Sequence, residues 1–415
     1  MPQPAPPDPK TAPSAPDVST SETWDPTAFD PPDFYDLEAL LSEEARHVRD
    51  NVRTVVTEEV MPIIEKYAQR GEFPRHLIST FAEHGLLGST LPPEYGGEGH
   101  SNIAYGLIMQ ELERGACGDR WVWWVRSGLV WYPLGQYGSE CERDHGLPPL
   151  GSGEAMGCFG VTEPDVGSNP DEMKTRARRD GDGWVIDGHK RWSTNATIAD
   201  VAVIWAKDED DTVRGFLVET DRDGVETPPI DDSWSLRAAV TSEVVLDDVR
   251  VPDAARLPEV SGLKGPLSCL TQARYGICWG TIGAAMACFD TARQHAQNRE
   301  QFGGPIGRFQ LMQERLVDMV QEITKAQLLN WRLGTLKEAG TMRPQQVSLA
   351  KRNNCQTALD VARSARQVLG GNGVTSMYPV MRHMNNLESV VTYEGTHEVH
   401  TLIVGEDVTG LNAFT

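Results

Sequence analysis

One carboxylate and two imidazoles lie close together near the C-terminus. Glu394, His397 and His400 follow one another at intervals of three residues, so a helix would carry them on one face. Such a group invites a metal-site interpretation, but no further His or Cys residues cluster with it in the sequence, and we expect no metal. Glu394 is then either a general base or an acid that starts a helix beside its N-terminal dipole.

Two other segments combine hydroxyls, glycines and aromatic side chains. Residues 158–170 read CFGVTEPDVGSNP, which is typical of a turn-rich loop and by itself fits an ordinary surface loop. Residues 190–195 read KRWSTN. The glycine-rich stretch 370–373 is too short for a dinucleotide fingerprint and has no βαβ unit around it, so it predicts a helix end and a turn.

Together these segments resemble the acyl-CoA dehydrogenases, from about residue 40 to the end of the chain. More narrowly, ARYGI at 273–277, KRNNC at 351–355 and YEGTH at 393–397 are similar to the glutaryl-CoA dehydrogenase subgroup. The resemblance implies an FAD cofactor, an acyl-CoA substrate and an electron-transferring flavoprotein as partner. It also implies a homotetramer, a dimer of dimers, because in this family each cofactor is shared between chains.

The resemblance also assigns the cofactor contacts residue by residue. The loop and the following strand are expected to touch the flavin, and a later stretch is expected to reach the FAD of a neighbouring subunit. Further contacts are expected at the adenosine and pyrophosphate, and after the catalytic segment. In chain order these residues are Phe159, Val161, Thr162, Gly167, Ser168, Trp192, Thr194, Arg299, Phe302, Gln310, Gln367, Gly370, Gly371, Thr396 and Glu398.

The chemistry predicted for Glu394 is removal of the α-proton of a thioester. That proton is weakly acidic, so the protein must supply a positioned base and must stabilise the developing enolate oxygen. Burial of Glu394 against apolar walls and the flavin is expected to raise its pKa toward working pH. The resemblance implies that the enolate oxygen is held by the backbone N–H of Glu394, and that the flavin accepts the β-hydride.

Arg120 carries the narrower prediction of a dicarboxyl substrate. It matches the arginine that in the subgroup pairs with the distal carboxylate, and a guanidinium can hold a carboxylate through two parallel hydrogen bonds. An ordinary surface ion pair is the alternative. Glu113 and Tyr393 match polar partners of decarboxylating members, and Ser168 and Arg274 are expected to contact substrate. The predicted reaction is oxidative decarboxylation of glutaryl-CoA to crotonyl-CoA and CO2.

One departure from the subgroup leaves alternatives open. Residues 121–127 read WVWWVRS, where the subgroup carries small and hydroxyl residues. These tryptophans either fill space between helices or narrow the acyl pocket. A non-decarboxylating dehydrogenase of an aryl, branched dicarboxyl or short-chain acyl-CoA therefore remains an alternative, as do a flavin oxidase and a non-catalytic protein that binds CoA esters.

Composition excludes several other classes of protein. The formal net charge is −22, so the surface should repel nucleic acid. No stretch approaches the roughly 20 apolar residues of a membrane span, so we expect no membrane partner. Seven scattered cysteines without a C-x-x-C pair, and an opening that has no secretory or transit pattern, favour a cytoplasmic protein.

Periodicity predicts an α+β chain of three domains. Residues 1–32 hold 10 of the 27 prolines, and we expect a disordered tail over 1–40. A helical domain is expected over 41–155, beginning at Ser42 as N-cap, with a kink at Pro62. Short β-branched runs predict an antiparallel β-domain over 156–258, and long helical periodicity predicts a C-terminal helical bundle over 259–415.

Overall fold

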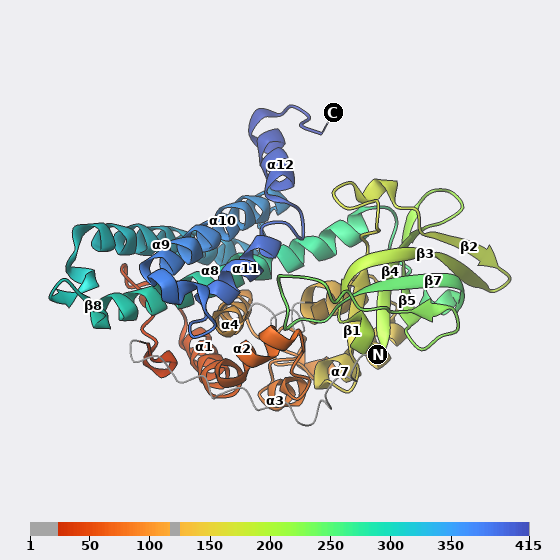
Figure 1. The fold of residues 1–415 in the computed structure, drawn as a ribbon. Coiled ribbons are helices and arrows are strands. Elements are labelled where there is room, and N and C mark those ends of the chain that lie inside the picture. The colour runs from red at the N-terminus through yellow and green to blue at the C-terminus, as the bar shows by residue number, and fades with distance from the viewer. Residues whose placement is uncertain (1–23, 117–124, 415) are drawn as a thin grey trace, which may run out of the picture.

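The computed structural model describes residues 24–116 and 125–414. Its N-terminal part is helical, as predicted, and lies below the long helices of the C-terminal part in the view of Figure 1. Ser42 is the N-cap of the first long helix, and its hydroxyl accepts a hydrogen bond from the Ala45 amide at 3.1 Å. The elements are 3₁₀ turns Pro26–Ala28 and Leu37–Leu40, α1 (Glu43–Val55), α2 (Met61–Arg70), α3 (Leu77–Glu83), α4 (Asn102–Gly115), α6 (Tyr132–Tyr137) and α7 (Glu140–Ser152).

The predicted kink at Pro62 takes the form of a widened turn. A π-helical segment, Val56–Val60, separates α1 from α2, and Pro62 lies in the first turn of α2. Proline has no N–H and its ring clashes with the preceding turn, so a regular α-helix cannot run through this position. A second π-helical segment, Val125–Trp131, leads into α6.

Residues 24–40 lie in the predicted disordered tail, but they are ordered against the helices. Trp24 packs against Tyr378, and the Gln294 side chain accepts a hydrogen bond from the Asp25 amide at 2.9 Å. Phe29 lies over the guanidinium of Arg114 at 4.6 Å. The proline-rich composition of the tail predicted disorder and gave no weight to Trp24 and Phe29. Burial of these two aromatic side chains offsets the entropy lost when the segment becomes ordered.

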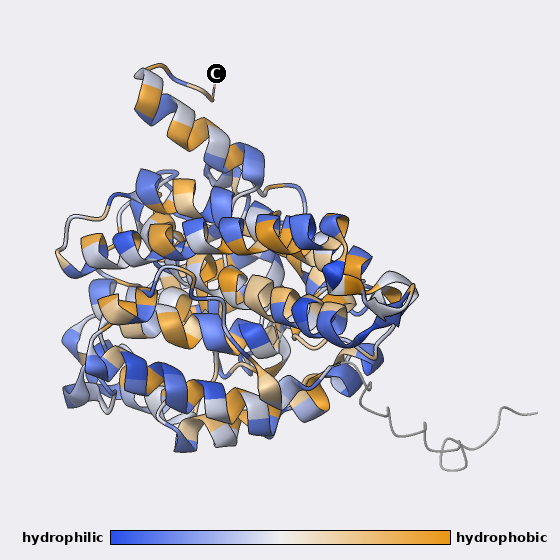
Figure 2. Cartoon of the chain, turned by 90° about the vertical axis from the view of Figure 1, so that its left-hand side faces the viewer, coloured by the Kyte–Doolittle hydropathy of each residue, from blue (hydrophilic) through white to orange (hydrophobic). Residues whose placement is uncertain are grey.

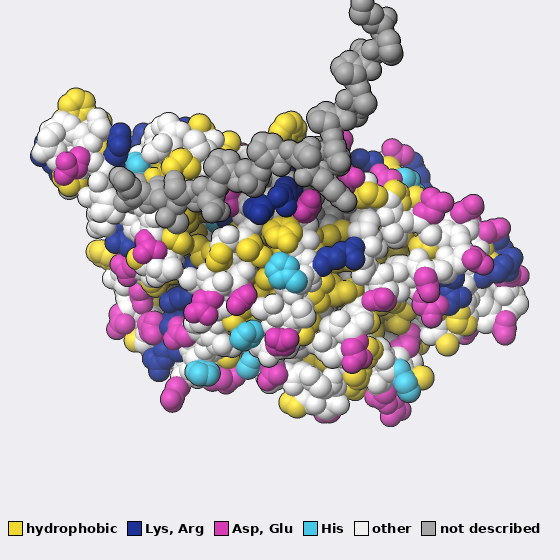
Figure 3. All heavy atoms as spheres, turned by 60° about the horizontal axis from the view of Figure 1, so that its bottom comes forward, with side chains coloured by type: hydrophobic (Ala, Val, Ile, Leu, Met, Phe, Trp, Pro, Cys, Tyr) yellow, Lys and Arg dark blue, Asp and Glu magenta, His cyan; other side chains and the backbone are white. Residues whose placement is uncertain are grey.

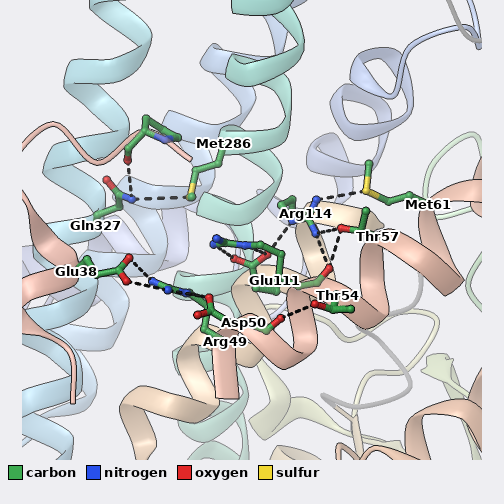
Figure 4. A network of polar contacts seen from close by, with 12 residues as sticks. Glu38, Arg49, Asp50, Thr54, Thr57, Met61, Glu111, Arg114, Met286 and Gln327 are labelled. Atoms are coloured by element: carbon green, nitrogen blue, oxygen red, sulfur yellow. Dashed lines mark hydrogen bonds and ion pairs between the residues drawn. The ribbon is translucent and has the colours of Figure 1, made fainter. Parts of the chain in front are cut away.

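Phe29 covers a buried ionic network between α1 and α4. Glu111 is fully buried and accepts hydrogen bonds from Arg114 and Arg53, both at 2.7 Å (Figure 4). Burial raises the pKa of Glu111, but the two guanidiniums overcome this effect and leave it below its usual value. The network joins the N-terminal segment, α1 and α4 into one unit.

The central part is a seven-stranded sheet in the order β1-β4-β2-β3-β7-β6, with β5 paired to β4. The short runs that predict strands, at 184–188, 201–205, 215–218 and 243–246, lie within β3, β4, β5 and β7. Most pairings are antiparallel, as predicted, but β1 and β2 each pair with β4 in parallel. The strands are β1 (Gly157–Gly160), β2 (Arg176–Asp180), β3 (Gly183–Thr194), β4 (Val201–Lys207), β5 (Val213–Glu219), β6 (Val225–Glu226) and β7 (Thr241–Pro252).

The C-terminal part is a bundle of long helices, again as predicted. Hydrophobic and hydrophilic residues alternate along the helices, and the last helix projects from the rest of the bundle (Figure 2). The elements are α8 (Lys264–Asn298), the hairpin β8 (Glu300–Gln301) and β9 (Gly304–Pro305), α9 (Gln310–Glu338), α10 (Pro344–Val368), the 3₁₀ turn Gly370–Val374, α11 (Val380–Val390) and α12 (His397–Thr409).

The surface carries the negative charge expected from composition. Asp and Glu side chains are spread across the face shown in Figure 3, with fewer Lys and Arg among them. Within the described ranges, no helix is long and apolar enough to cross a bilayer. The same part of the chain holds no group of three His, Cys, Asp or Glu side chains that could bind a metal ion.

Candidate active site

Glu394 lies in the short loop between α11 and α12, and its backbone is left-handed. Its φ is 57° and that of Gly395 is 92°. A β-carbon on Gly395 would lie 2.9 Å from His400 Nε2, so only glycine fits this position. Thr396 is the N-cap of α12 and accepts a hydrogen bond from the Val399 amide at 3.2 Å. Helix α12 therefore begins directly after the predicted base.

Buried polar side chains from three helices surround this loop. Lys351 of α10 and Arg274 of α8 donate to its backbone carbonyls, and His400 lies on the first turns of α12. Burial, followed by the charges of Lys351 and Arg274, lowers the pKa of His400 to about 2, so this imidazole is neutral. His400, which the spacing with Glu394 suggested as a metal ligand, thus belongs to the support of the loop.

The first predicted flavin-binding loop leaves the sheet at the end of β1. Phe159 is 7% exposed, whereas Gly167 and Ser168 are exposed. The carbonyl of Thr162 accepts a hydrogen bond from the Arg191 amide at 2.8 Å, which joins the loop to β3. The structure therefore brings the motifs at 158–170 and 190–195 together.

A buried ion pair anchors the same loop, and sequence reasoning did not find it. Glu163 accepts hydrogen bonds from Lys190 Nζ at 2.8 Å and from Thr175 Oγ1 at 2.6 Å. Burial raises the pKa of Glu163, but Lys190 and the other donors overcome this and bring it to about 2. Burial likewise lowers the pKa of Lys190 to about 8, against the opposing charge of Glu163.

Trp192 sits in a bulge of β3 with its side chain open to solvent. The register of β3 against β7 shifts between Lys190 and Ser193, the φ of Trp192 is 62°, and its side chain is 54% exposed. A bulge turns a side chain out of the regular pleat, and here it presents an indole beside the loop. Thr194, two residues on, is buried at the end of the strand.

Six predicted cofactor contacts lie towards the other end of the bundle: Arg299, Phe302, Gln310, Gln367, Gly370 and Gly371. The hairpin β8–β9 and the sheet are at opposite ends of the molecule (Figure 1). Phe302 is 87% exposed, and with Gln310 it lines a pocket of about 660 Å³. Gln367 lies in the last turn of α10, whereas Gly370 and Gly371 follow its end, and a β-carbon on either glycine would meet nothing within 4 Å.

The residues near the sheet fit a flavin dinucleotide. Trp192 offers an exposed aromatic face to a flat ring, and the glycine at 167 leaves the loop backbone open to close approach, since a β-carbon there would meet nothing within 4 Å. The backbone of the 3₁₀ turn after α10 is also open to close approach at Gly370 and Gly371. Glu398 is exposed in the first turn of α12, and its own backbone N–H and the Thr396 hydroxyl lower its pKa.

The structure describes some of the predicted substrate contacts and not others. Glu113 is fully buried on α4, and Tyr393 is half-buried beside Glu394. The Nε of Arg274 is engaged with the backbone of the Glu394 loop. Arg120 and the tryptophans at 121, 123 and 124 lie outside the described residues.

Comparison with known proteins shows the family to which this chain belongs. Three consecutive domains match: "Acyl-CoA dehydrogenase, N-terminal domain" over 42–154, "middle domain" over 158–249 and "C-terminal domain" over 261–409. The chain belongs to the acyl-CoA dehydrogenase family. It is an enzyme of the acyl-CoA dehydrogenase type, and its cofactor is FAD.

Individual relatives narrow the comparison. The chain is similar to a glutaryl-CoA dehydrogenase from Mycobacterium smegmatis, with 50% identity, a TM-score of 0.89, and coverage of 91% of this chain and 98% of that one. A glutaryl-CoA dehydrogenase from the same organism, solved with FADH2, gives 45% identity and a TM-score of 0.91, covering 93% and 100% of the two chains. The short-chain specific acyl-CoA dehydrogenase of Bos taurus mitochondria is 31% identical over 369 residues, covering 88% of this chain and 90% of that protein.

Proposed function

We propose that this chain catalyses oxidative decarboxylation of glutaryl-CoA, with Glu394 as the base. The observation that carries the substrate assignment is the 50% identity with a glutaryl-CoA dehydrogenase, against 31% with a short-chain enzyme. The presence of Glu113, Arg120, Tyr393 and Glu394 in one chain supports the same substrate. Phe159, Val161, Thr162, Gly167, Ser168, Trp192 and Thr194 would hold the flavin in this proposal.

The first step removes the α-proton of the thioester. The carboxylate of Glu394 accepts the proton, and the backbone N–H of Glu394 donates to the enolate oxygen. Bound FAD supplies the acceptor for the β-hydride. Since the proton and the hydride leave adjacent carbons, the product carries a double bond between the α- and β-carbons.

The second step uses the proton that Glu394 has gained. The bond between the γ-carbon and the distal carboxylate breaks, CO2 leaves, and the electron pair delocalises into the thioester. Glu394 then returns its proton to the γ-carbon and yields crotonyl-CoA. Arg120 pairs with the distal carboxylate before this step, with Glu113 and Tyr393 as its polar neighbours.

Product analysis tests the proposed reaction. Purified enzyme given glutaryl-CoA and an artificial electron acceptor should release crotonyl-CoA and CO2 in equal amounts. Chromatography of the CoA esters and trapping of labelled CO2 follow the two products. An unsaturated dicarboxyl-CoA without CO2 would indicate a non-decarboxylating enzyme, and turnover of butyryl-CoA without turnover of glutaryl-CoA would contradict the substrate.

Two substitutions separate substrate recognition from proton removal. Arg120→Ala should lower kcat/KM for glutaryl-CoA by about 10² or more, because it leaves the distal carboxylate unpaired, while butyryl-CoA changes little. Glu394→Gln should still bind FAD, but its rate of flavin bleaching should fall by at least about 10³-fold with both substrates. Equal losses of Arg120→Ala on the two substrates would show that Arg120 only supports the fold.

A short-chain acyl-CoA is the second candidate substrate. The relative from Bos taurus and the tryptophans after Arg120 favour it, because bulky side chains in that segment would shorten the acyl pocket. The kcat/KM values for butyryl-CoA and glutaryl-CoA in the same assay decide between them.

The distribution of the cofactor contacts supports a shared site in a homotetramer. Arg274, next to the Glu394 loop, lies on α8, and Arg299, before the β8–β9 hairpin, directly follows that helix. The 25 residues between them span about 37 Å of helix. One dinucleotide does not extend over that length, so in this proposal the hairpin serves the cofactor of a neighbouring subunit. An electron-transferring flavoprotein would accept the electrons, and the reduced thiols fit a cytoplasmic setting.

A further inference from the structure

Three successive backbone carbonyls around Glu394 are each held by a buried side chain. Lys351 Nζ donates to the carbonyl of Tyr393 at 2.6 Å and to that of Gly395 at 2.7 Å. Arg274 Nε donates to the carbonyl of Glu394 at 2.7 Å. His400 Nε2 lies 3.2 Å from the same oxygen, and as a neutral imidazole it donates there.

The backbone that these donors hold is strained. The left-handed region is unfavourable for any residue other than glycine, and Glu394 has a φ of 57°. Such a conformation persists only when the surroundings impose it. Here the next residue is also left-handed, and helix α12 begins two residues later. The orientation of the Glu394 side chain and of its N–H therefore depends on the three donors.

Among these three donors, Lys351 has the most unfavourable burial. Its side chain is 1% exposed on the apolar face of α10, and Arg274 is 9% exposed. Burial lowers the pKa of Lys351, and the nearby carboxylate of Glu394 favours the charged form of both cations. Burying an ammonium carries a large desolvation penalty, and satisfying two carbonyls does not require a charged side chain. Lys351 bridges the two carbonyls on either side of Glu394, which fixes the peptide planes before and after that residue.

We propose that Lys351 is a positioning residue for Glu394, with Arg274 and His400 as its assistants. By holding residues 393–395, Lys351 sets the direction of the Glu394 carboxylate and of the backbone N–H that receives the enolate oxygen. The inference rests on the proposed role of Glu394 as base, and it applies whichever acyl-CoA is the substrate. A misplacement of 1 Å at a reacting group can cost about 10² in rate, so loss of Lys351 affects the proton transfer more than the binding of substrate.

The test measures the reductive half-reaction in variants at position 351. Lys351→Met keeps the length of the side chain and removes the ammonium, whereas Lys351→Arg keeps charge and two donors. We expect Lys351→Met to lower the rate constant of flavin bleaching by about 10² while the Kd of the acyl-CoA changes less than about threefold. The rate constant of flavin bleaching should be at least tenfold higher in Lys351→Arg than in Lys351→Met. Lys337→Met is the matched control, since its ammonium lies over the Tyr275 ring at 4.1 Å, and it should stay near the wild-type rate.

Three outcomes would overturn the proposal: bleaching by Lys351→Met at the wild-type rate, equal losses in the Met and Arg variants, or an equal loss in Lys337→Met. If Lys351→Met does not fold, the pair His400→Leu and His400→Gln replaces it, because glutamine can place its amide where Nε2 lies. His400→Leu should then lose about tenfold and His400→Gln less. Indistinguishable rates of these two would also contradict the proposal.

A measurement without substrate separates this proposal from the proposed function. Hydrogen exchange in peptides covering residues 391–399 reports whether the loop is held, and Lys351→Met should exchange faster there than Lys337→Met. Unchanged exchange contradicts the role of Lys351. If Glu394→Gln bleaches the flavin like the wild type, the proposed function fails, whatever the exchange experiment shows. Rate constants are taken with the acyl-CoA that bleaches wild-type flavin fastest, so an incorrect assignment of glutaryl-CoA leaves this test intact.

Discussion

At the residue scale, two buried lysines hold the loops of the predicted active site. Lys351 and Lys190 are almost completely buried, and each holds a loop that the predicted site needs. Lys351 lies among Val347, Ala350 and Cys355 on the buried face of α10, a spacing that already marks it as a charge on an apolar face. The sequence contained this signal, but only the contacts show that the ammonium donates to the backbone carbonyls on both sides of Glu394.

The Glu163–Lys190 pair predicts a defined dependence of stability on pH. Glu163 has a folded pKa of about 2, below its usual 4.5, so its contribution to the free energy of unfolding is complete above about pH 4.5 and falls as the pH drops toward 2. Lys190, with a folded pKa of about 8, adds no change between pH 3 and 6. The stability difference between wild type and Glu163→Gln should therefore be largest near pH 6 and shrink toward pH 3, as measured by chemical unfolding.

An exposed pair in the same loop provides the control. Asp165 and Lys174 are 77% and 68% exposed, so water and salt screen the attraction between them. Asp165→Asn should therefore differ little from wild type at any of these pH values. A constant difference between wild type and Glu163→Gln from pH 6 to pH 3 would mean that the buried pair is not ionised in the folded protein.

At the scale of elements, α4 and α8 pack in direct contact along their lengths. A β-carbon on Gly283 would lie 1.8 Å from the carbonyl oxygen of Gln110, and one on Gly106 would lie 2.4 Å from the ring of Trp279. Glycine at position 283 lets the helix backbones touch, and glycine at position 106 makes room for the Trp279 ring. The distance between the two helices is therefore set by residues without side chains.

Gly283→Ala tests this contact. The added methyl group forces the helices apart and should destabilise the protein by about 3 kcal/mol, at the upper end of overpacking effects. Thermal unfolding followed by circular dichroism measures the shift. Gly135→Ala is the matched control, because a β-carbon there meets nothing within 4 Å, and it should change stability by less than about 0.5 kcal/mol. Equal effects of the two substitutions would contradict the packing argument.

At the scale of the whole molecule, the candidate cofactor contacts divide between two ends. The loop at 159–168 and Trp192 lie with the sheet, whereas the hairpin with Phe302 lies beyond the other end of α8 (Figure 1). Phe302 has a φ of 54° and is 87% exposed, which is costly for a large aromatic side chain in an isolated chain. A neighbouring subunit that covers it would account for both features.

Phe302→Ala should weaken this assembly and the retention of FAD. We expect light scattering to give about four times the 45.7 kDa chain mass for the wild type and a smaller average mass for the variant. The ratio of flavin to protein absorbance should fall at least about twofold. Phe34→Ala, at a side chain that is 78% exposed in the N-terminal segment, should change neither value. A wild-type monomer with a full complement of FAD would rule out the shared site.

The sequence by itself determined the order of the helical and β parts, the N-cap at Ser42, the kink near Pro62 and four of the strands. Each of these follows from local periodicity or from the covalent properties of one residue, which act over a few positions. The motifs also determined the family and its cofactor, since the comparisons bear out both.

Only the tertiary structure decided how distant residues meet. The ordering of residues 24–40 depends on Tyr378 and Arg114, and the left-handed Glu394 depends on Lys351 and Arg274, all far away in the chain. The parallel pairing of β1 with β4 is likewise invisible in either strand alone. These features arise from burial and hydrogen bonding between segments, which no local pattern encodes.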